Sequence, residues 1–145
     1  METVIYEDTH RAIAMVLSCI DYRFIDKTIH FIEGTEADDR FDLTTLAGAS
    51  LGYNQTKYKC WRETFLQLVQ LAIELHHIEE IIVVDHMDCG AYALFYPGLE
   101  SNSEQERAHH IKNIHRFIKS IRKKYPNFIY RGYLLHLDDT VETVI

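Results

Sequence analysis

Short apolar runs alternate along this chain with stretches in which apolar residues recur at helical spacing. The runs lie at residues 11–18, 41–47, 79–85 and 128–137. The run at 11–18 (RAIAMVLS) shows little polar alternation, which is typical of a strand covered on both faces in a parallel sheet. Residues 79–85 (EEIIVVD) form the most strand-like run of the chain. We therefore expect strands at all four places.

The stretches between these runs are predicted to be helices, because their apolar residues recur three or four positions apart. They cover residues 22–33, 61–76, 91–96 and a segment that begins near 101–104 and ends at Pro126. In the helix at 61–76, the residues expected to share one face are Trp61, Phe65, Leu68, Val69, Ala72 and Leu75. Residues 48–52 are interpreted as a tight glycine-containing turn, and the tail after Asp138 is too short to assign.

This order of elements predicts the fold class. Strands that alternate with helices indicate an α/β fold with a mainly parallel central sheet, of about four to five strands, flanked by helices. A chain of 145 residues suits a single domain, which we expect to span 1–145. In such sheets, binding sites lie beyond the carboxyl ends of the strands. Reactive residues that directly follow a predicted strand are therefore the strongest functional candidates.

The composition excludes several classes of protein. With 47% hydrophobic and 26% charged residues, the chain has the make-up of an ordinary globular protein. Its net charge of −7 argues against general nucleic-acid binding and against an anionic membrane surface as partner. No apolar stretch approaches the roughly 20 residues of a membrane-spanning helix, and a start with Glu2, Glu7 and Asp8 is unlike a signal peptide. We therefore expect a cytoplasmic protein whose three cysteines are reduced.

Two short segments directly follow predicted strands and carry most of the reactive side chains. They are CIDYR at residues 19–23 and HMDCG at residues 86–90. Zinc favours thiolate and imidazole ligands in a tetrahedron, and three protein ligands leave a fourth position for a water whose pKa falls to about 7. Cys19, His86 and Cys89 are therefore the candidate ligands. Considered one at a time, they have a plainer interpretation as two buried free thiols and a hydrogen-bonded histidine.

Asp21 and Arg23 are the candidate residues for orienting that water. In an extended chain, Asp21 points to the same side as Cys19, so its carboxylate can reach the metal or a metal-bound water. Arg23 can hold the carboxylate with paired, charge-assisted hydrogen bonds. The alternative is an ion pair with a structural role only. Asp88 is either a neighbour of the metal site or a turn former.

The remaining cysteine, histidines and tyrosines have less specific interpretations. Cys60 has no neighbour at metal-ligand spacing and is expected to be a packed or surface thiol. His109, His110 and His115 are expected to face solvent from the last predicted helix, while His136 is kept as a candidate proton relay. Four tyrosines have two possible roles. They either line a pocket or a dimer contact, or are partly buried with an exposed hydroxyl: Tyr53, Tyr58, Tyr92 and Tyr96.

The two segments together resemble the β-class carbonic anhydrases. The resemblance lies in Cys-x-Asp-x-Arg after one strand and His-x-x-Cys-Gly after a later one, and it extends over about residues 12–137. It implies that zinc is bound by the two cysteines and the histidine already named. It also implies that Asp21 and Arg23 form the family's aspartate–arginine dyad. Because the aspartate of some members moves onto the zinc, Asp21 is a candidate fourth ligand.

The activity implied by this resemblance is the reversible hydration of carbon dioxide to bicarbonate by a zinc-bound hydroxide. It also implies assembly into a homodimer or a larger homo-oligomer. The chain departs from the family in two places: the N-terminal helical arm is expected to be missing or vestigial, and residues 44–50 (TTLAGAS) lack the usual arginine or asparagine. Two alternatives therefore stay open: a non-catalytic zinc-binding or regulatory module of the same fold, and a hydrolase of carbon disulfide or carbonyl sulfide.

Overall fold

The computed structural model describes residues 9–145, in which five strands form one mixed sheet. The strands are β1 (Ala14–Ser18), β2 (Phe41–Thr45), β3 (Glu80–His86), β4 (Ile129–Leu135) and β5 (Val141–Thr143). Their order across the sheet is β2-β1-β3-β4-β5. The first four are parallel, and β5 runs antiparallel to β4. The predicted α/β fold with a mainly parallel sheet is therefore confirmed.

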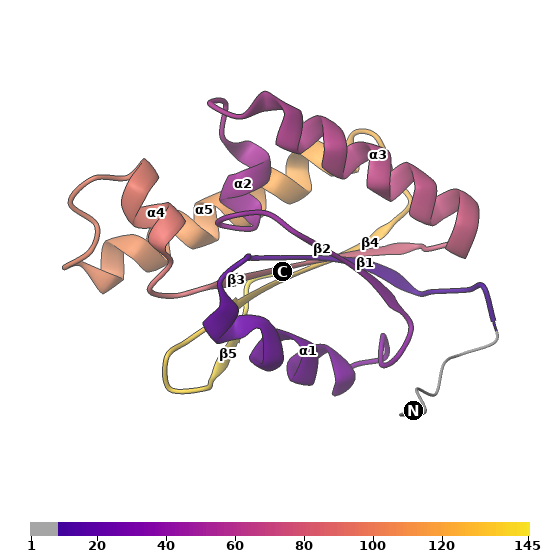
Figure 1. The fold of residues 1–145 in the computed structure, drawn as a ribbon, viewed down its shortest axis with the longest axis horizontal. Helices are drawn as coiled ribbons and strands as arrows, with labels where there is room; N and C mark the ends of the chain where they lie inside the picture. Colours follow the sequence, from indigo (N-terminus) through magenta and orange to yellow (C-terminus); the bar gives the residue numbers. More distant parts are fainter. Residues whose placement is uncertain (1–8) are drawn as a thin grey trace, which may run out of the picture.

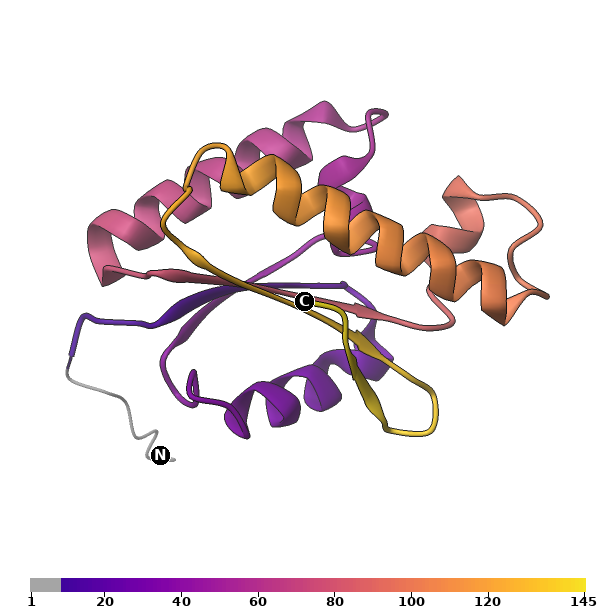
Figure 2. The ribbon, with the colours of Figure 1, turned by 180° about the vertical axis from the view of Figure 1, so that it is seen from behind.

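Helices lie on both sides of this sheet, as Figures 1 and 2 show from opposite directions. On one side is α1 (Ile25–Glu33), which follows the 3₁₀ turn η1 (Tyr22–Phe24). On the other side are α2 (Ser50–Asn54), α3 (Lys59–His76), α4 (Gly90–Phe95) and α5 (Ser103–Arg122). The sheet is thus the middle layer of three, and its strands are covered on both faces.

The alternation of side chains along the strands gives one large apolar cluster on each face of the sheet, and a third, smaller cluster includes Cys19 and Cys89. In β1, Met15 and Leu17 belong to the cluster shared with α3 and α5, whereas Ala14 and Val16 belong to the cluster shared with α1. All seven residues of β3 are buried. Burial on both faces explains why these runs lack polar alternation in the sequence.

A glycine sets the distance between α5 and the sheet. A Cβ atom on Gly132 of β4 would lie 2.5 Å from Cγ2 of Ile114, so only glycine permits this close approach. The buried apolar residues of α5 are Ile114, Phe117, Ile118 and Ile121. This close contact places α5 directly against β4, the neighbour of β3, whose end carries His86.

Three local features differ from the sequence-based predictions. The tail after Asp138 forms β5, which is only three residues long and so carries no periodic signal of its own. The predicted turn at residues 48–52 continues into the short helix α2. Leu68 and Leu75 are exposed by 37% and 58%, because the stripe of α3 that meets the sheet is narrower than the predicted face. The buried residues of α3 are Phe65, Val69 and Ala72.

Three expectations concern membranes and the start of the chain. Within residues 9–145, no helix is long and apolar enough to cross a membrane. Two predictions concern residues 1–8, which lie outside the described residues. They are that the first residues are unlike a signal peptide and that the N-terminal arm is missing or vestigial. These two expectations, and the cytoplasmic location, stay predictions.

Candidate metal centre

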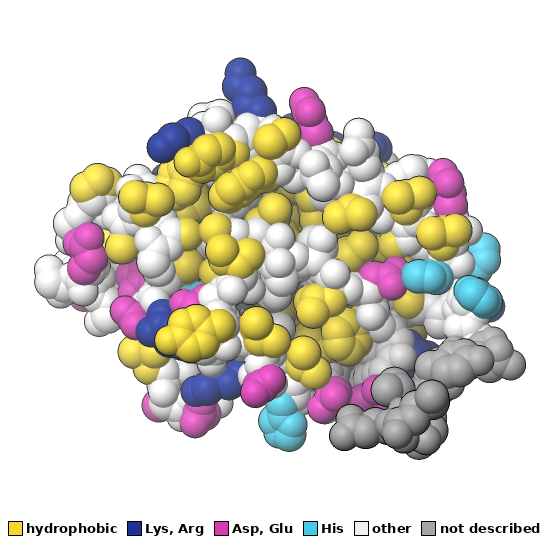
Figure 3. Space-filling model, viewed as in Figure 1, with side chains coloured by type: hydrophobic (Ala, Val, Ile, Leu, Met, Phe, Trp, Pro, Cys, Tyr) yellow, Lys and Arg dark blue, Asp and Glu magenta, His cyan; other side chains and the backbone are white. Residues whose placement is uncertain are grey.

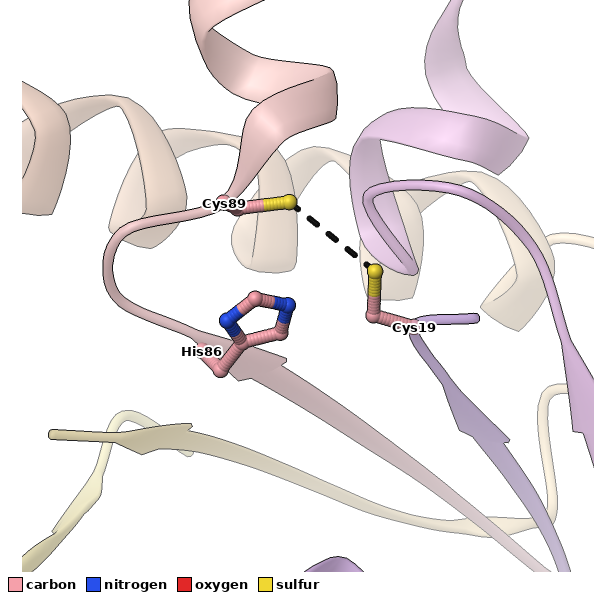
Figure 4. A group of neighbouring side chains, drawn as sticks. All are labelled: Cys19, His86 and Cys89. Carbon is pink, nitrogen blue, oxygen red and sulfur yellow. Dashed lines mark hydrogen bonds between the residues drawn. The ribbon is translucent and has the colours of Figure 1, made fainter. Parts of the chain in front are cut away.

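Three side chains from two distant parts of the sequence meet beyond the carboxyl ends of two strands (Figure 4). Cys19 directly follows β1, His86 is the last residue of β3, and Cys89 immediately precedes α4. Because β1 and β3 are neighbouring parallel strands, their carboxyl ends lie at the same edge of the sheet. One ligand atom from each side chain lies within 4.8 Å of the other two, and all three residues are buried. The structure thus brings the three predicted ligands together.

The hydrogen bonding of His86 leaves one ring nitrogen available to a metal. Nδ1 lies 2.8 Å from the backbone oxygen of Met87, which can only accept, so Nδ1 carries the proton. Nε2 therefore presents its lone pair, and it is buried without a hydrogen-bond partner among the described residues. A buried polar atom without a partner is costly, and a metal ion would satisfy it. Two thiols and one imidazole are the donor set that zinc prefers.

The two sulfur atoms lie 3.9 Å apart, within hydrogen-bond distance, and either one can be the donor. A hydrogen bond from Cys89 lowers the pKa of Cys19 to about 4, against the opposing effect of burial. The neighbouring Cys19 sulfur, followed by burial, raises the pKa of Cys89 well above its ordinary value. Gly48, whose φ of 79° lies in the left-handed region, donates its backbone N–H to Sγ of Cys19 at 3.3 Å. One thiolate is therefore already stabilised, and a bound cation would displace the second proton.

Asp21 and Arg23 form a pair beside these three side chains. Nη2 of Arg23 donates to Oδ2 of Asp21 at 2.7 Å, and Nε donates to Oδ1 at 3.0 Å. Asp21 also caps η1 by accepting the backbone N–H of Arg23. The hydrogen bonds from Arg23 lower the pKa of Asp21 to about 2. Since Oδ2 of Asp21 lies 3.8 Å from Nε2 of His86, the carboxylate is next to the candidate metal position.

Asp88 acts both as a turn former and as a neighbour of the site. Its φ of 56° lies in the left-handed region, which aspartate adopts more readily than most residues, and this bends the chain between His86 and Cys89. Its carboxylate accepts a hydrogen bond from Nη1 of Arg23 at 2.8 Å, and its backbone oxygen accepts one from Nη2 at 2.9 Å. Arg23 therefore ties the segment after β1 to the segment after β3.

A cavity of about 640 Å³ opens beside the site. Cys19, Cys89, Asp21 and Arg23 form part of its wall, so it leads to the candidate metal position. The rest of the wall is largely apolar and includes Ile20, Tyr22, Tyr58, Trp61, Leu94 and Phe95. A small apolar molecule could therefore approach the two thiols and the carboxylate from this side.

His110 and two tyrosines are buried, which corrects the sequence-based predictions. His110 was expected to face solvent, but it is fully buried, with Nδ1 2.8 Å from Oδ2 of Asp85. The helical pattern did not reveal this because the partner, Asp85, lies at the end of β3, far away in the sequence. For Tyr92 and Tyr53 two alternatives were open: a pocket or dimer contact, or partial burial with an exposed hydroxyl. Both side chains are instead buried, and their hydroxyls are hydrogen-bonded to Asp85 and Ser120.

The sequence analysis missed three residues that surround the candidate ligands. Asp85 accepts hydrogen bonds from the backbone N–H of Ser50 at 3.0 Å and from its hydroxyl at 2.7 Å. Glu106 accepts the backbone N–H of Cys89 at 3.0 Å. A signal was available for Asp85, because a carboxylate that closes a buried apolar strand needs donors around it. Glu106 and Ser50 carry no comparable signal in the local sequence.

Other predicted residues lie outside this group of side chains. Cys60 is exposed, in line with a surface thiol, and His115 is exposed as expected. His136, kept as a candidate proton relay, lies with Nε2 3.0 Å from Oε2 of Glu142 in β5. Tyr96 stacks on the ring of His109 with the centroids 4.0 Å apart.

Sequence relatives cover most of the chain. Residues 9–144 match the family model described as "Putative carbonic anhydrase". An uncharacterized protein of Rickettsia conorii is 32% identical over 136 residues, which cover 93% of this chain and 73% of that protein. An uncharacterized protein of Rickettsia bellii is also 32% identical over 136 residues, which cover 93% of this chain and 83% of that protein.

Solved structures of β-carbonic anhydrases share the fold. A tetrameric β-carbonic anhydrase of Sordaria macrospora matches with a TM-score of 0.60 at 13% identity, over 93% of this chain and 81% of its own. The β-carbonic anhydrase CafD of Aspergillus fumigatus matches with a TM-score of 0.59 at 13% identity, over 99% and 95% of the two chains. At these identities the structural likeness shows the fold alone. Because the family model matches nearly the whole chain, the protein belongs to that carbonic-anhydrase family, as a divergent member with the β-carbonic anhydrase fold.

Proposed function

We propose that this protein is a zinc-dependent lyase that hydrates carbon dioxide reversibly to bicarbonate. The observation that supports this most directly is the meeting of two buried thiols and an imidazole next to a carboxylate that an arginine holds. Membership of the family and the fold point in the same direction. Cys19, His86 and Cys89 are the residues that would hold the zinc ion.

Asp21 and Arg23 have distinct tasks in this proposal. When bound, the zinc ion supplies a Lewis acid that lets water ionise near neutral pH. Asp21 is ionised at that pH, because its pKa is lowered to about 2, and it accepts a hydrogen bond from the attacking water and so directs its lone pair. Arg23 keeps the carboxylate charged and fixed in direction through its paired hydrogen bonds. The apolar wall of the cavity suits a linear molecule without charge.

Asp21 is also the candidate fourth ligand of the zinc ion. In the structure, both of its carboxylate oxygens accept hydrogen bonds from Arg23. A move onto the metal requires at least one of these bonds to break. Arg23 therefore favours the arrangement in which Asp21 stays free to orient water.

We further infer that the chain forms a homodimer or a larger homo-oligomer. Tyr22 and Leu94, at the mouth of the cavity, are exposed by 83% and 71%. Figure 3 shows hydrophobic side chains gathered on one face over α2, α4 and the start of α3. Apolar surface of this kind marks a contact with another molecule. The neighbour from Sordaria macrospora is tetrameric, and a second copy of this chain would cover this face and narrow the cavity.

Stopped-flow measurement of carbon dioxide hydration tests the activity, with the zinc content of the same sample determined in parallel. We expect hydration far above the uncatalysed rate, its loss in Asp21→Asn, and full activity in the control Cys60→Ser, which changes an exposed thiol. One bound zinc per chain without hydration would support the non-catalytic module instead. Assays with carbonyl sulfide and carbon disulfide address the hydrolase alternative, which the apolar wall of the cavity also suits.

A further inference from the structure

A network of hydrogen-bonded polar side chains lies next to the candidate metal centre. It starts at Asp85, which directly precedes His86 and is 1% exposed. Oδ2 of Asp85 accepts hydrogen bonds from the hydroxyl of Tyr92 at 2.7 Å and from Nδ1 of His110 at 2.8 Å. Oδ1 accepts the backbone N–H of Ser50 at 3.0 Å. Asp85 thus connects the end of β3 to α2, α4 and α5.

Glu106 forms the other end of this network. Its Oε1 accepts the backbone N–H of Cys89 at 3.0 Å and lies 3.4 Å from Nε2 of His110. A carboxylate oxygen faces each ring nitrogen of His110, and this arrangement favours the imidazolium form. Burial lowers the pKa of His110, but the hydrogen bonds with Asp85 and Glu106 outweigh it and leave the pKa above 6.5. The network therefore favours a positive charge on His110 between the two carboxylates of Asp85 and Glu106.

Each backbone segment that carries a candidate ligand is connected to this network of polar side chains. Asp85 is adjacent to His86 in the sequence, and Glu106 holds the backbone of Cys89. Ser50 begins α2 two residues after Gly48, whose N–H contacts the sulfur of Cys19. All three ligand atoms are thus linked to the network through short segments of backbone.

The backbone at Cys89 needs such support. The preceding residue, Asp88, adopts a left-handed conformation, and α4 starts directly after Cys89 without a side-chain cap. The carboxylate of Glu106 supplies an acceptor at this helix start, where negative charge is also favourable. Ion pairs at buried positions such as Asp85 and His110 add little net stability, because the cost of removing charges from water offsets their attraction. These groups therefore serve to fix the position of the backbone around the ligands rather than to add stability.

We propose that His110 and Glu106 are positioning residues for the metal centre, which keep the three ligand atoms of Cys19, His86 and Cys89 at binding distance. The inference rests on metal binding by these three residues, which is part of the proposed function. It assigns to α5 a role that no local motif of the chain reveals. The two residues act through the backbone of Cys89 and through Asp85, without contact to the metal.

Zinc affinity and the absorption spectrum of the cobalt-substituted protein test this role. We expect Glu106→Ala and His110→Asn to raise the zinc Kd by about 10- to 100-fold, measured by competition with a chromogenic chelator. The cobalt absorption bands should shift in both variants, because the ligand geometry changes. Glu106→Gln keeps an oxygen that accepts the N–H of Cys89, so it should recover most of the affinity. If Glu106→Ala does not fold, Glu106→Asp, which is too short to reach this N–H, answers the same question.

Asn113→Ala is the matched control. Asn113 is buried on the same helix, and its side chain is hydrogen-bonded to Asn54 and Tyr96. This variant should lose stability towards urea but keep the zinc affinity and the cobalt spectrum. If Glu106→Ala and His110→Asn behave in the same way as this control, the positioning role is wrong. If the unaltered protein binds no zinc, the proposed function fails as well, whereas zinc binding that all variants retain overturns only this inference.

Discussion

The imidazole of His86 is stacked on the ring of Phe24, with the ring centroids 4.0 Å apart and the planes inclined by 21°. Phe24 belongs to η1, the 3₁₀ turn that Asp21 caps. A single turn after β1 therefore supplies the carboxylate, the guanidinium of Arg23 and the flat surface against which the imidazole rests. This arrangement restricts rotation of His86 and keeps Nε2 directed at the two sulfur atoms.

Removing the ring of Phe24 should weaken both the fold and the metal site. We expect Phe24→Ala to lower the free energy of unfolding by about 3 kcal/mol, because it empties a buried site. It should also raise the zinc Kd, since His86 gains freedom to rotate. Urea denaturation and zinc competition measure the two effects. Phe65→Ala, in the cluster shared with α3 and α5, is the control that should lose similar stability and keep its zinc affinity; equal zinc affinities in the two variants would contradict the prediction.

Replacing one thiol should remove the metal and leave the fold. We expect Cys19→Ser to lose its zinc on gel filtration, because a serine hydroxyl does not replace a thiolate ligand. Its far-UV circular dichroism should match that of the unaltered protein, because the two large apolar clusters do not depend on the metal. Cys60→Ser should retain one zinc per chain. An unfolded Cys19→Ser variant would show instead that the metal is required for folding.

The charge of His110 should make stability depend on pH. Its pKa in the folded protein lies above the ordinary 6.5, so its stabilising effect is complete below about pH 6.5 and disappears as the pH rises through the folded value. Tyr92, which faces the same ring, stays neutral throughout, because burial raises its pKa. The unfolding free energy of the metal-free protein should therefore exceed that of His110→Asn most near about pH 6 and less near about pH 9. A difference that does not change with pH would contradict the charged state of His110.

A charge on the exposed face near α4 should prevent self-association. We expect Leu94→Glu to lower the molar mass in solution to that of a monomer, because a carboxylate cannot be buried in an apolar contact without a partner. Light scattering during size-exclusion chromatography measures this mass. Leu75→Glu, an exposed leucine near the end of α3, should leave the mass unchanged. If Leu94→Glu keeps the mass of the unaltered protein, the contact lies elsewhere.

The order of strands and helices could be predicted from the sequence, because each long element carries its own period. The wholly buried β3 and the amphipathic α3 and α5 are recognisable from neighbouring positions alone. The predictions missed β5 and α2, of three and five residues, because such short elements form through contacts with the sheet and with α5 rather than through a local pattern.

In the candidate site, too, some features could be predicted from the local sequence and others depend on tertiary packing. The motifs at residues 19–23 and 86–90 follow strands, and parallel strands end at one edge of a sheet, so the local sequence was sufficient to predict that these side chains could meet. The groups that surround these side chains depend on how distant elements pack together. The contacts of Cys89 with Glu106 and of Asp85 with His110 join residues 17 and 25 positions apart, on elements with different periods. Such contacts depend on how α5 packs across β4 at Gly132, and no local pattern of hydrophobic and polar residues records that packing.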